Sequence, residues 1–261
     1  MTFADAKQRF SNRVADYVRY RPSYPDALIH LLHTECGLQK FHQVADIGSG
    51  TGFLSKLFAR NGNRVLGVEP NDEMRQAGEE FLAAYPNFTS VPGSAEATNI
   101  ADACIDFVTA GQAFHWFEPA ATRREFARIL KPGGWVVAIW NDRRINETAF
   151  GRAYEDLLVR CGTDYAKVRE AYPEAEEMEQ FFGAGNFQRS ELPNFQEFDF
   201  EGLAGRLRSS SYAPREGHAN YEPMMAALRT LFDANEKFGR VRMQYTTQIY
   251  FGHLDSARNA R

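Results

Sequence analysis

The chain has 261 residues, enough to bury roughly 70–75% of its unfolded surface as one large domain or two small ones. Its composition, 44% hydrophobic and 25% charged with 20 Gly and 11 Pro, excludes collagen-like, low-complexity and wholly disordered proteins. Thirty basic and 34 acidic residues leave a net charge of -4, so no global positive field attracts phosphate backbones. We therefore expect no nucleic-acid partner.

The N-terminal segment mixes charges throughout and lacks the apolar run of a signal peptide. No stretch approaches the roughly 18 apolar residues that a membrane span needs. We expect a cytoplasmic protein with no membrane partner. Cys36, Cys104 and Cys161 lie far apart without CxxC spacing, which predicts reduced thiols and no metal site.

From Gln43 onward, short β-branched runs alternate with amphipathic helical stretches. This alternation predicts an α/β fold with a mostly parallel sheet and helices on both faces. Strands are expected over 43–47, 64–68, 88–91, 105–110 and 135–140, and helices over 53–60, 72–85 and 120–130.

After Asn141 the strict alternation ends. The period-2 aromatic residues of 195–200 indicate a half-buried strand, and a longer strand is expected over 241–250. Helices are expected over 147–160, 174–182, 201–208 and 221–238, and a frayed tail over 256–261. Because no repeat or linker divides the chain, we expect a single domain.

A glycine-rich loop, Gly48-Ser49-Gly50-Thr51-Gly52, follows the first strand directly and opens a helix. Glycines there let the backbone approach a ligand closely at the carboxyl edge of the sheet. Glu69 stands at the end of the second strand, where a carboxylate can bind both hydroxyls of a ribose. Together these features predict a nucleotide-cofactor site.

The spacing of the glycines and the acid before them restrict which class of cofactor the loop can bind. Its G-x-G-x-G spacing differs from the G-x-G-x-x-G of dinucleotide-binding proteins, and no GKS or GKT follows, which excludes a P-loop. Asp46 precedes the loop and would repel a pyrophosphate, whereas it suits a cationic amino group. A dinucleotide-dependent oxidoreductase stays open as an alternative because it shares the sheet and the ribose acid.

The sequence resembles the class I S-adenosylmethionine-dependent methyltransferases, in particular the small-molecule group that includes trans-aconitate-methyltransferase-like proteins. The segments that carry the resemblance are 17–25, 46–52, 67–74, 93–97, 112–117 and 130–134. The resemblance implies a Rossmann-like, seven-stranded, mostly parallel sheet with an antiparallel last strand. It divides the single domain 1–261 into an N-terminal helical lid (1–40), a cofactor-binding core (41–141), strands and helical insertions that shape the acceptor pocket (142–255) and a tail (256–261).

S-adenosyl-L-methionine is the implied cofactor, and one set of residues is assigned to its methionine part. Asp46 would face the amino group, Arg21 would pair with the carboxylate, and Tyr17 would close over it. The other members of this set lie in the glycine loop or border the sulfonium: Gly48, Ser49, Gly50, Gly52, Gln112 and Ala113.

A second set is assigned to adenosine, with Glu69 on the ribose hydroxyls. Many relatives carry Asp where this chain has Ser94, so the contact to the adenine amino group would pass to Glu96 or a backbone carbonyl. The residues that would flank or edge the adenine ring are Pro70, Met74, Ser94, Ala95 and Glu96.

The expected reaction is metal-independent, in-line methyl transfer to a small-molecule acceptor, through a carboxylate or hydroxyl oxygen. His115 would act as base if the acceptor must lose a proton, although it could equally be a half-buried histidine that caps the fourth strand. Arg21 or Arg143 would orient a carboxylate. An S-adenosylmethionine-binding protein without methyl transfer remains an alternative.

A mostly apolar acceptor cavity is expected from the aromatic residues of the N-terminal segment and the strand ends. These residues are Tyr17, Tyr20, Tyr24, Phe114, Trp116 and Trp140.

Overall fold

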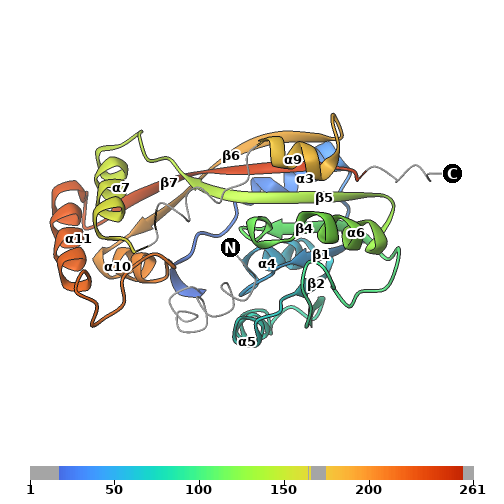
Figure 1. Cartoon of the computed structure of the whole chain (residues 1–261), viewed down its shortest axis with the longest axis horizontal. Coiled ribbons are helices and arrows are strands. Elements are labelled where there is room, and N and C mark those ends of the chain that lie inside the picture. The colour runs from blue at the N-terminus through green and yellow to red at the C-terminus, as the bar shows by residue number, and fades with distance from the viewer. Residues whose placement is uncertain (1–17, 164, 166–174, 255–261) are drawn as a thin grey trace.

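A computed structural model describes residues 18–163, 165 and 175–254. Seven strands form one sheet in the order β3-β2-β1-β4-β5-β7-β6 (Figure 1). The strands are β1 (Gln43–Ile47), β2 (Arg64–Val68), β3 (Phe88–Val91), β4 (Ile105–Gly111), β5 (Leu130–Arg143), β6 (Phe187–Phe198) and β7 (Val241–Gly252). Pairing is parallel from β3 to β5, and β7 runs antiparallel to both neighbours. The predicted mostly parallel sheet with an antiparallel last strand is confirmed.

The described helices cover both faces of this sheet and extend beyond one end of it. They are α3 (Ala27–Cys36), α4 (Phe53–Asn61), α5 (Asp72–Phe81), the short 3₁₀ helix η2 (Phe114–Trp116), α6 (Pro119–Ile129), α7 (Ala149–Cys161), α9 (Ala175–Phe182), α10 (Phe200–Arg208) and α11 (Tyr221–Asn235). Local sequence accounts for their ends. For example, Glu118 caps α6 by accepting from the backbone of Ala120 and Ala121, with Pro119 in the first turn.

Two apolar clusters lie on opposite faces of the sheet. Successive β1 residues separate between them, because side chains alternate along a strand: Val44 packs with α3 and α4, and Ala45 packs with α6 and α9. Leu28 and Leu32 of α3 are fully buried. Residues 27–36 of the segment expected to form a lid therefore belong to the core.

A third apolar cluster lies outside this sandwich, where α7, α10 and α11 pack on the far ends of β6 and β7. Figure 1 shows how it arises, because β5, β6 and β7 are long and carry the chain away from β1 and β2 towards these helices. We call α7, α10 and α11 the C-terminal lobe. The cavity described below lies where this lobe meets the carboxyl ends of the parallel strands.

Several element boundaries differ from the sequence prediction. β6 covers Phe187–Phe198 and not 195–200, because Asp199 caps α10 by accepting from the Gly202 backbone, and the chain turns there into a helix. β6 also contains Pro193, which an edge strand tolerates. The helices predicted over 72–85 and 221–238 end earlier, at Phe81 and Asn235.

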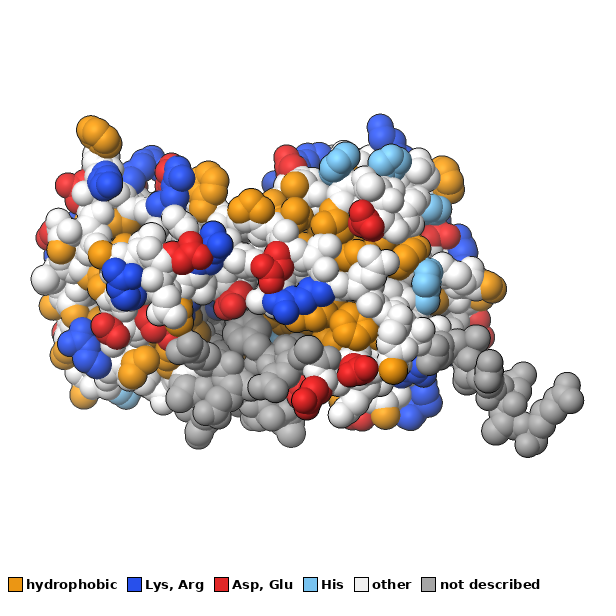
Figure 2. Space-filling model, turned by 90° about the horizontal axis from the view of Figure 1, so that it is seen from above, with side chains coloured by type: hydrophobic (Ala, Val, Ile, Leu, Met, Phe, Trp, Pro, Cys, Tyr) orange, Lys and Arg blue, Asp and Glu red, His pale blue; other side chains and the backbone are white. Residues whose placement is uncertain are grey.

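Basic and acidic side chains are interspersed over the face shown in Figure 2, with no extended field of one sign. No helix in the described ranges combines the length and apolarity needed to cross a bilayer.

Candidate active site

A cavity of about 360 Å³ opens at the carboxyl ends of β1, β4 and β5. The glycine loop after β1 and Gln112 after β4 contribute one wall. Arg143 at the end of β5, together with Arg206 and Tyr212 of the C-terminal lobe, contributes the opposite one. The cavity therefore lies between the carboxyl edge of the parallel strands and the C-terminal lobe.

The glycine loop needs its glycines for backbone reasons. Gly48, Gly50 and Gly52 have φ values of 67°, 56° and 86°, in the region that side chains disfavour. At Gly48 a Cβ atom would also lie 2.6 Å from the Cβ of Ala113. The loop thus turns tightly against the segment after β4 and leaves its backbone as the floor of the cavity.

Asp46, the last but one residue of β1, is a buried carboxylate in the wall of this cavity. Its oxygens accept hydrogen bonds from the hydroxyls of Ser55 at 2.6 Å and Thr109 at 3.3 Å. Burial raises the pKa of Asp46 to about 7, although those hydroxyl bonds oppose the shift. A cationic group bound beside Asp46 would favour its charged form.

Glu69 lies behind the glycine loop and does not line the cavity. Its carboxylate accepts from the backbone N–H of Gly50 and of Asn71, each at 2.9 Å, and so ties the loop to the end of β2. Burial raises the pKa of Glu69, and these two backbone bonds oppose the shift.

The predicted site residues divide into two groups. Those that line the cavity are Arg21, Asp46, Gly48, Ser49, Gly50, Gln112 and His115, whereas Gly52, Glu69, Pro70, Met74, Ser94, Ala95, Glu96 and Ala113 lie outside it. Glu96 accepts from the backbone N–H of Glu118 at 3.0 Å. Tyr17 is outside the described residues.

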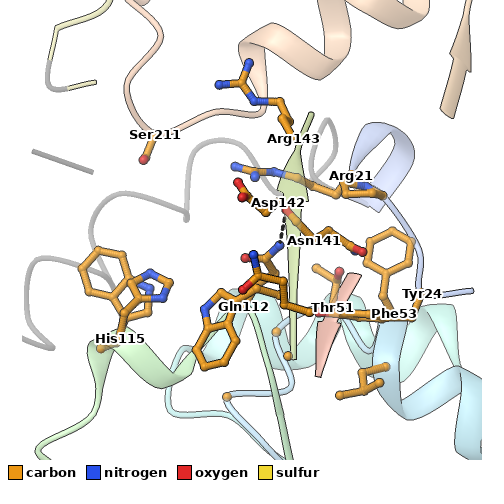
Figure 3. Close-up of a pocket in the computed structure, with 18 of the residues that line it drawn as sticks. Arg21, Tyr24, Thr51, Phe53, Gln112, His115, Asn141, Asp142, Arg143 and Ser211 are labelled. Atoms are coloured by element: carbon orange, nitrogen blue, oxygen red, sulfur yellow. Dashed lines mark hydrogen bonds between the residues drawn. The ribbon is translucent and has the colours of Figure 1, made fainter. Parts of the chain in front are cut away.

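Gln112 and His115 mark the side of the cavity nearest β4 (Figure 3). The side-chain amide of Gln112 donates to the Asn141 carbonyl at 3.1 Å, and its φ of 56° is a strained conformation of the kind found at functional sites. Burial lowers the pKa of His115 to about 4, so its imidazole is neutral near pH 7.

The opposite side of the cavity is strongly polar. Arg143 donates to the Glu155 carboxylate at 3.0 Å and to the Tyr165 hydroxyl at 2.6 Å, and Arg206 is only 4% exposed. The expectation of a mostly apolar cavity is wrong, because the C-terminal lobe brings arginine and tyrosine side chains to it.

Of the aromatic residues expected in the cavity, some line it and one belongs to the core. Tyr24, Trp116 and Trp140 line it. Phe114 instead packs in the core against Phe181, with ring centroids 4.6 Å apart.

Sequence reasoning missed Arg206, Tyr212 and Tyr165. They occur in segments that carry no motif, so only their position in space connects them with the site. The Ser209-Ser210-Ser211 run beside Tyr212 is the one local signal in that stretch, and a run of serines by itself predicts only a turn.

A model of the methyltransferase domain matches residues 45–138. An uncharacterized methyltransferase of Schizosaccharomyces pombe is 27% identical over 249 residues, which cover 95% of this chain and 94% of that protein. An uncharacterized methyltransferase of Mycobacterium bovis is 36% identical over 170 residues, 65% of this chain and 66% of the other. The chain belongs to the class I S-adenosylmethionine-dependent methyltransferases. The trans-aconitate-like group is not distinguished by these matches.

Solved structures agree with the fold of this methyltransferase. A protein assigned as a type II methyltransferase from Anaeromyxobacter dehalogenans superposes with a TM-score of 0.63 at 22% identity, covering 90% of this chain and 98% of the other. A Haemonchus contortus phosphoethanolamine N-methyltransferase, solved with S-adenosylhomocysteine, gives 0.56 at 14% identity, covering 97% and 59%.

The cavity wall of the methyltransferase fits the methionine end of S-adenosylmethionine. Asp46 offers a buried carboxylate to an amino group, and Gly48 leaves the loop floor free of side chain. Thr51 is 1% exposed, and its hydroxyl has no hydrogen-bond partner among the described residues although it lines the cavity. A buried polar group of this kind is usually satisfied by a ligand or water.

Proposed function

We propose that this enzyme transfers a methyl group from S-adenosylmethionine to an oxygen atom of a small-molecule acceptor that binds in the cavity between the glycine loop and the C-terminal lobe. The observation that carries the proposal is the cavity of about 360 Å³, whose lining includes both Asp46 with the glycine loop and Arg143 with Arg206. Its size suits a small ligand.

In this proposal, the methionine part of the cofactor lies on Gly48, Ser49 and Gly50. Asp46 faces its amino group and Arg21 its carboxylate. Adenosine lies outside the described cavity, along Glu69 and the residues assigned to it: Pro70, Met74, Ser94, Ala95 and Glu96. Support for this direction comes from the hydrogen bond that Gly50 N–H donates to Glu69, since it joins Glu69 to the loop on which the methionine part would lie.

The cofactor supplies an activated methyl group on a sulfonium, so the protein has to align the acceptor and exclude water. Gln112 and Ala113 border the reacting end, and the Gln112–Asn141 hydrogen bond holds that border rigid. Tyr24, Trp116 and Trp140 exclude water from the same end. The described residues contain no group of three or more metal-ligating side chains, and metal independence stays a prediction.

His115 is the proposed proton acceptor where the methylated oxygen carries a proton. Because burial lowers its pKa to about 4, the imidazole is unprotonated throughout the neutral range, and the same shift makes it a weaker base than an ordinary histidine. For His115→Gln, kcat/KM should fall about a hundredfold, with an unchanged dissociation constant for S-adenosylhomocysteine. Equal activity of the variant would return His115 to the role of a strand-end histidine.

Equilibrium titration with S-adenosylhomocysteine and, separately, with NADH tests the cofactor. We expect binding of the first only, whereas binding of NADH alone would contradict the proposal and favour an oxidoreductase. Turnover is then tested by release of S-adenosylhomocysteine with fractionated metabolite mixtures. A protein that binds the cofactor but yields none with a broad panel of acceptors would be a binder without methyl transfer.

A further inference from the structure

One end of the cavity is rich in arginine, and we call it the arginine end. Arg21, Arg143 and Arg206 line it, and the acids of the described residues at this end are Asp142, in the lining, and Glu155, which pairs with Arg143. Figure 3 shows Arg143 across the cavity from Gln112 and His115, with Arg21 and Asp142 between them. The remaining carboxylate in the wall, Asp46, belongs to the glycine-loop end.

Arg206 is a buried arginine at this end of the cavity. Its guanidinium donates to the hydroxyls of Ser210 at 2.9 Å and Tyr245 at 3.4 Å, and it makes no ion pair with any described residue. At 4% exposure it is also shielded from water. A buried charge without an ionic partner is strongly disfavoured, so a protein that keeps one commonly supplies the partner from a ligand.

Tyr212 lines the same end of the cavity, and the pKa of its hydroxyl is lowered by the positive charges there. Burial on its own would raise the pKa of this phenol, but the guanidiniums of Arg143 and Arg206, with Arg21, lower it by more. Tyr212 also contacts Tyr165 edge to face, with ring centroids 4.9 Å apart. The Tyr212 hydroxyl therefore lies in the positive field of the guanidiniums. It can donate a hydrogen bond to an anion bound there, or the anion can take its place beside the arginines.

Arg143 differs from Arg206 because it already has an acid. Glu155 and the Tyr165 hydroxyl hold it, and the Tyr165 hydroxyl donates to Glu155 at 2.5 Å. Arg143 is thereby fixed in direction, with its charge balanced. Of these two arginines, Arg206 is the one without an acid among the described residues.

We propose that Arg206, with Arg143 and Tyr212 beside it, binds an anionic group of the acceptor, a carboxylate or phosphate, that is distinct from the oxygen receiving the methyl group. The distinction follows from position and chemistry. Arg143 of this subsite lies across the cavity from Gln112 and His115 in Figure 3, and Arg206 and Tyr212 line the same cavity. An oxyanion whose lone pairs are engaged by guanidiniums is also a weakened nucleophile. The assignment of the bound anion to the methyl acceptor rests on the proposed function.

The test measures anion binding directly on the full chain saturated with S-adenosylhomocysteine. Malonate, inorganic phosphate and neutral malonamide are titrated at constant ionic strength and about pH 7.5, with the thermal unfolding midpoint and calorimetry as readouts. We expect malonate or phosphate to raise the midpoint and malonamide to have no effect. The stronger of the two anions identifies the class of the acceptor's anionic group.

Arg206→Gln should weaken that anion about tenfold or more, since one charge-assisted interaction is lost, and leave S-adenosylhomocysteine affinity unchanged. Arg215→Gln, an exposed arginine shortly after Tyr212, is the matched control and should bind the anion as the wild type does. If Arg206→Gln does not fold, Arg206→Lys replaces it, and the loss of the forked donor should still weaken malonate several-fold.

No anion-dependent shift in the wild type, or the same shift in Arg206→Gln, would overturn the subsite. So would a tyrosinate absorption band at neutral pH that persists with malonate and disappears in Tyr212→Phe, because the counter-charge would then be internal. A wild type that binds anions but not S-adenosylhomocysteine would refute the proposed function and leave the anion site standing.

Discussion

At the scale of single residues, burial in the cavity wall shifts the pKa values of an acid and a base in opposite directions. It raises the pKa of Asp46 to about 7 and lowers that of His115 to about 4, because the interior disfavours whichever form is charged. Near neutral pH His115 is therefore uncharged, and Asp46 is about half ionised. For Asp46, a bound cation favours the charged form, which couples its ionisation to occupation of the site.

Asp46→Asn should stabilise the ligand-free protein increasingly as pH rises. The folded-state pKa of about 7 lies above the ordinary 3.8, so the folded wild type holds the proton more tightly and loses stability as pH rises through that window. The free energy of unfolding of the variant minus that of the wild type should be about 2–3 kcal/mol larger at pH 8 than at pH 5, which means that the variant gains relative stability. Urea denaturation at the two pH values measures this difference.

Asp72→Asn is the control, because Asp72 is an exposed acid at the start of α5. It should show no comparable pH-dependent gain. Under the proposed function, Asp46→Asn also binds S-adenosylhomocysteine more weakly. A relative stability that does not change between the two pH values would contradict the raised pKa.

At the scale of elements, the N-terminal segment is attached to the C-terminal lobe through α10. The Tyr20 ring packs directly on Gly205, and Arg21 donates to the Ser209 carbonyl at 2.9 Å. Gln196 of β6 adds a bond to the Tyr20 carbonyl at 3.1 Å. Gly205 is needed because any larger residue would occupy the space of the ring, and the contact in turn places Arg21 at the cavity.

Gly205→Ala should lower the free energy of unfolding by about 1–3 kcal/mol, as overpacking does, and displace the segment that carries Arg21. Tyr20→Ala removes the ring and with it the clash. In the double variant the Gly205 substitution should therefore be nearly neutral, and a double-mutant cycle by chemical denaturation measures the coupling. Additive effects of the two substitutions would show that the ring and the glycine are not in contact.

At the scale of the whole molecule, Asn141 joins segments that are far apart in the sequence. Its side-chain oxygen accepts from Thr247 at 2.6 Å and from Asn194 at 3.1 Å, which links β5 to β7 and β6. Its side-chain nitrogen donates to the Ser23 carbonyl at 3.3 Å, and its own carbonyl accepts from Gln112. The N-terminal segment, the sheet and the reacting end of the cavity are thus connected through one buried amide.

Asn141→Ala should destabilise the protein by about 2–3 kcal/mol, because it leaves the buried Thr247 hydroxyl and the Asn194 amide with poorer partners and removes the donor to the Ser23 carbonyl. The unfolding midpoint should fall by several degrees in thermal denaturation. Asn235→Ala, which removes one bond to the Leu231 carbonyl at the end of α11, should cost about 1 kcal/mol or less. Equal losses for the two variants would refute the connecting role of Asn141.

Most of the cofactor half was predictable from the sequence. The strands over 43–47 and 64–68, the glycine loop and Glu69 depend on local patterns, and the structure has both strands at those bounds. The boundaries of β6 were not predictable, since an edge strand with alternating exposure and an internal proline carries a weak local signal.

The sequence by itself determined the parallel sheet, the glycine loop and the methyltransferase family, because β-branched runs, positive-φ glycines and an acid at a strand end act over short stretches of chain. Only the tertiary structure decided which residues lie across the cavity from the cofactor-binding half. Arg143 ends β5, whereas Arg206 and Tyr212 belong to α10 and the turn after it, and long-range packing of the C-terminal lobe brings them together. Their position in one cavity gives a polar, arginine-containing wall where the sequence predicted an apolar one.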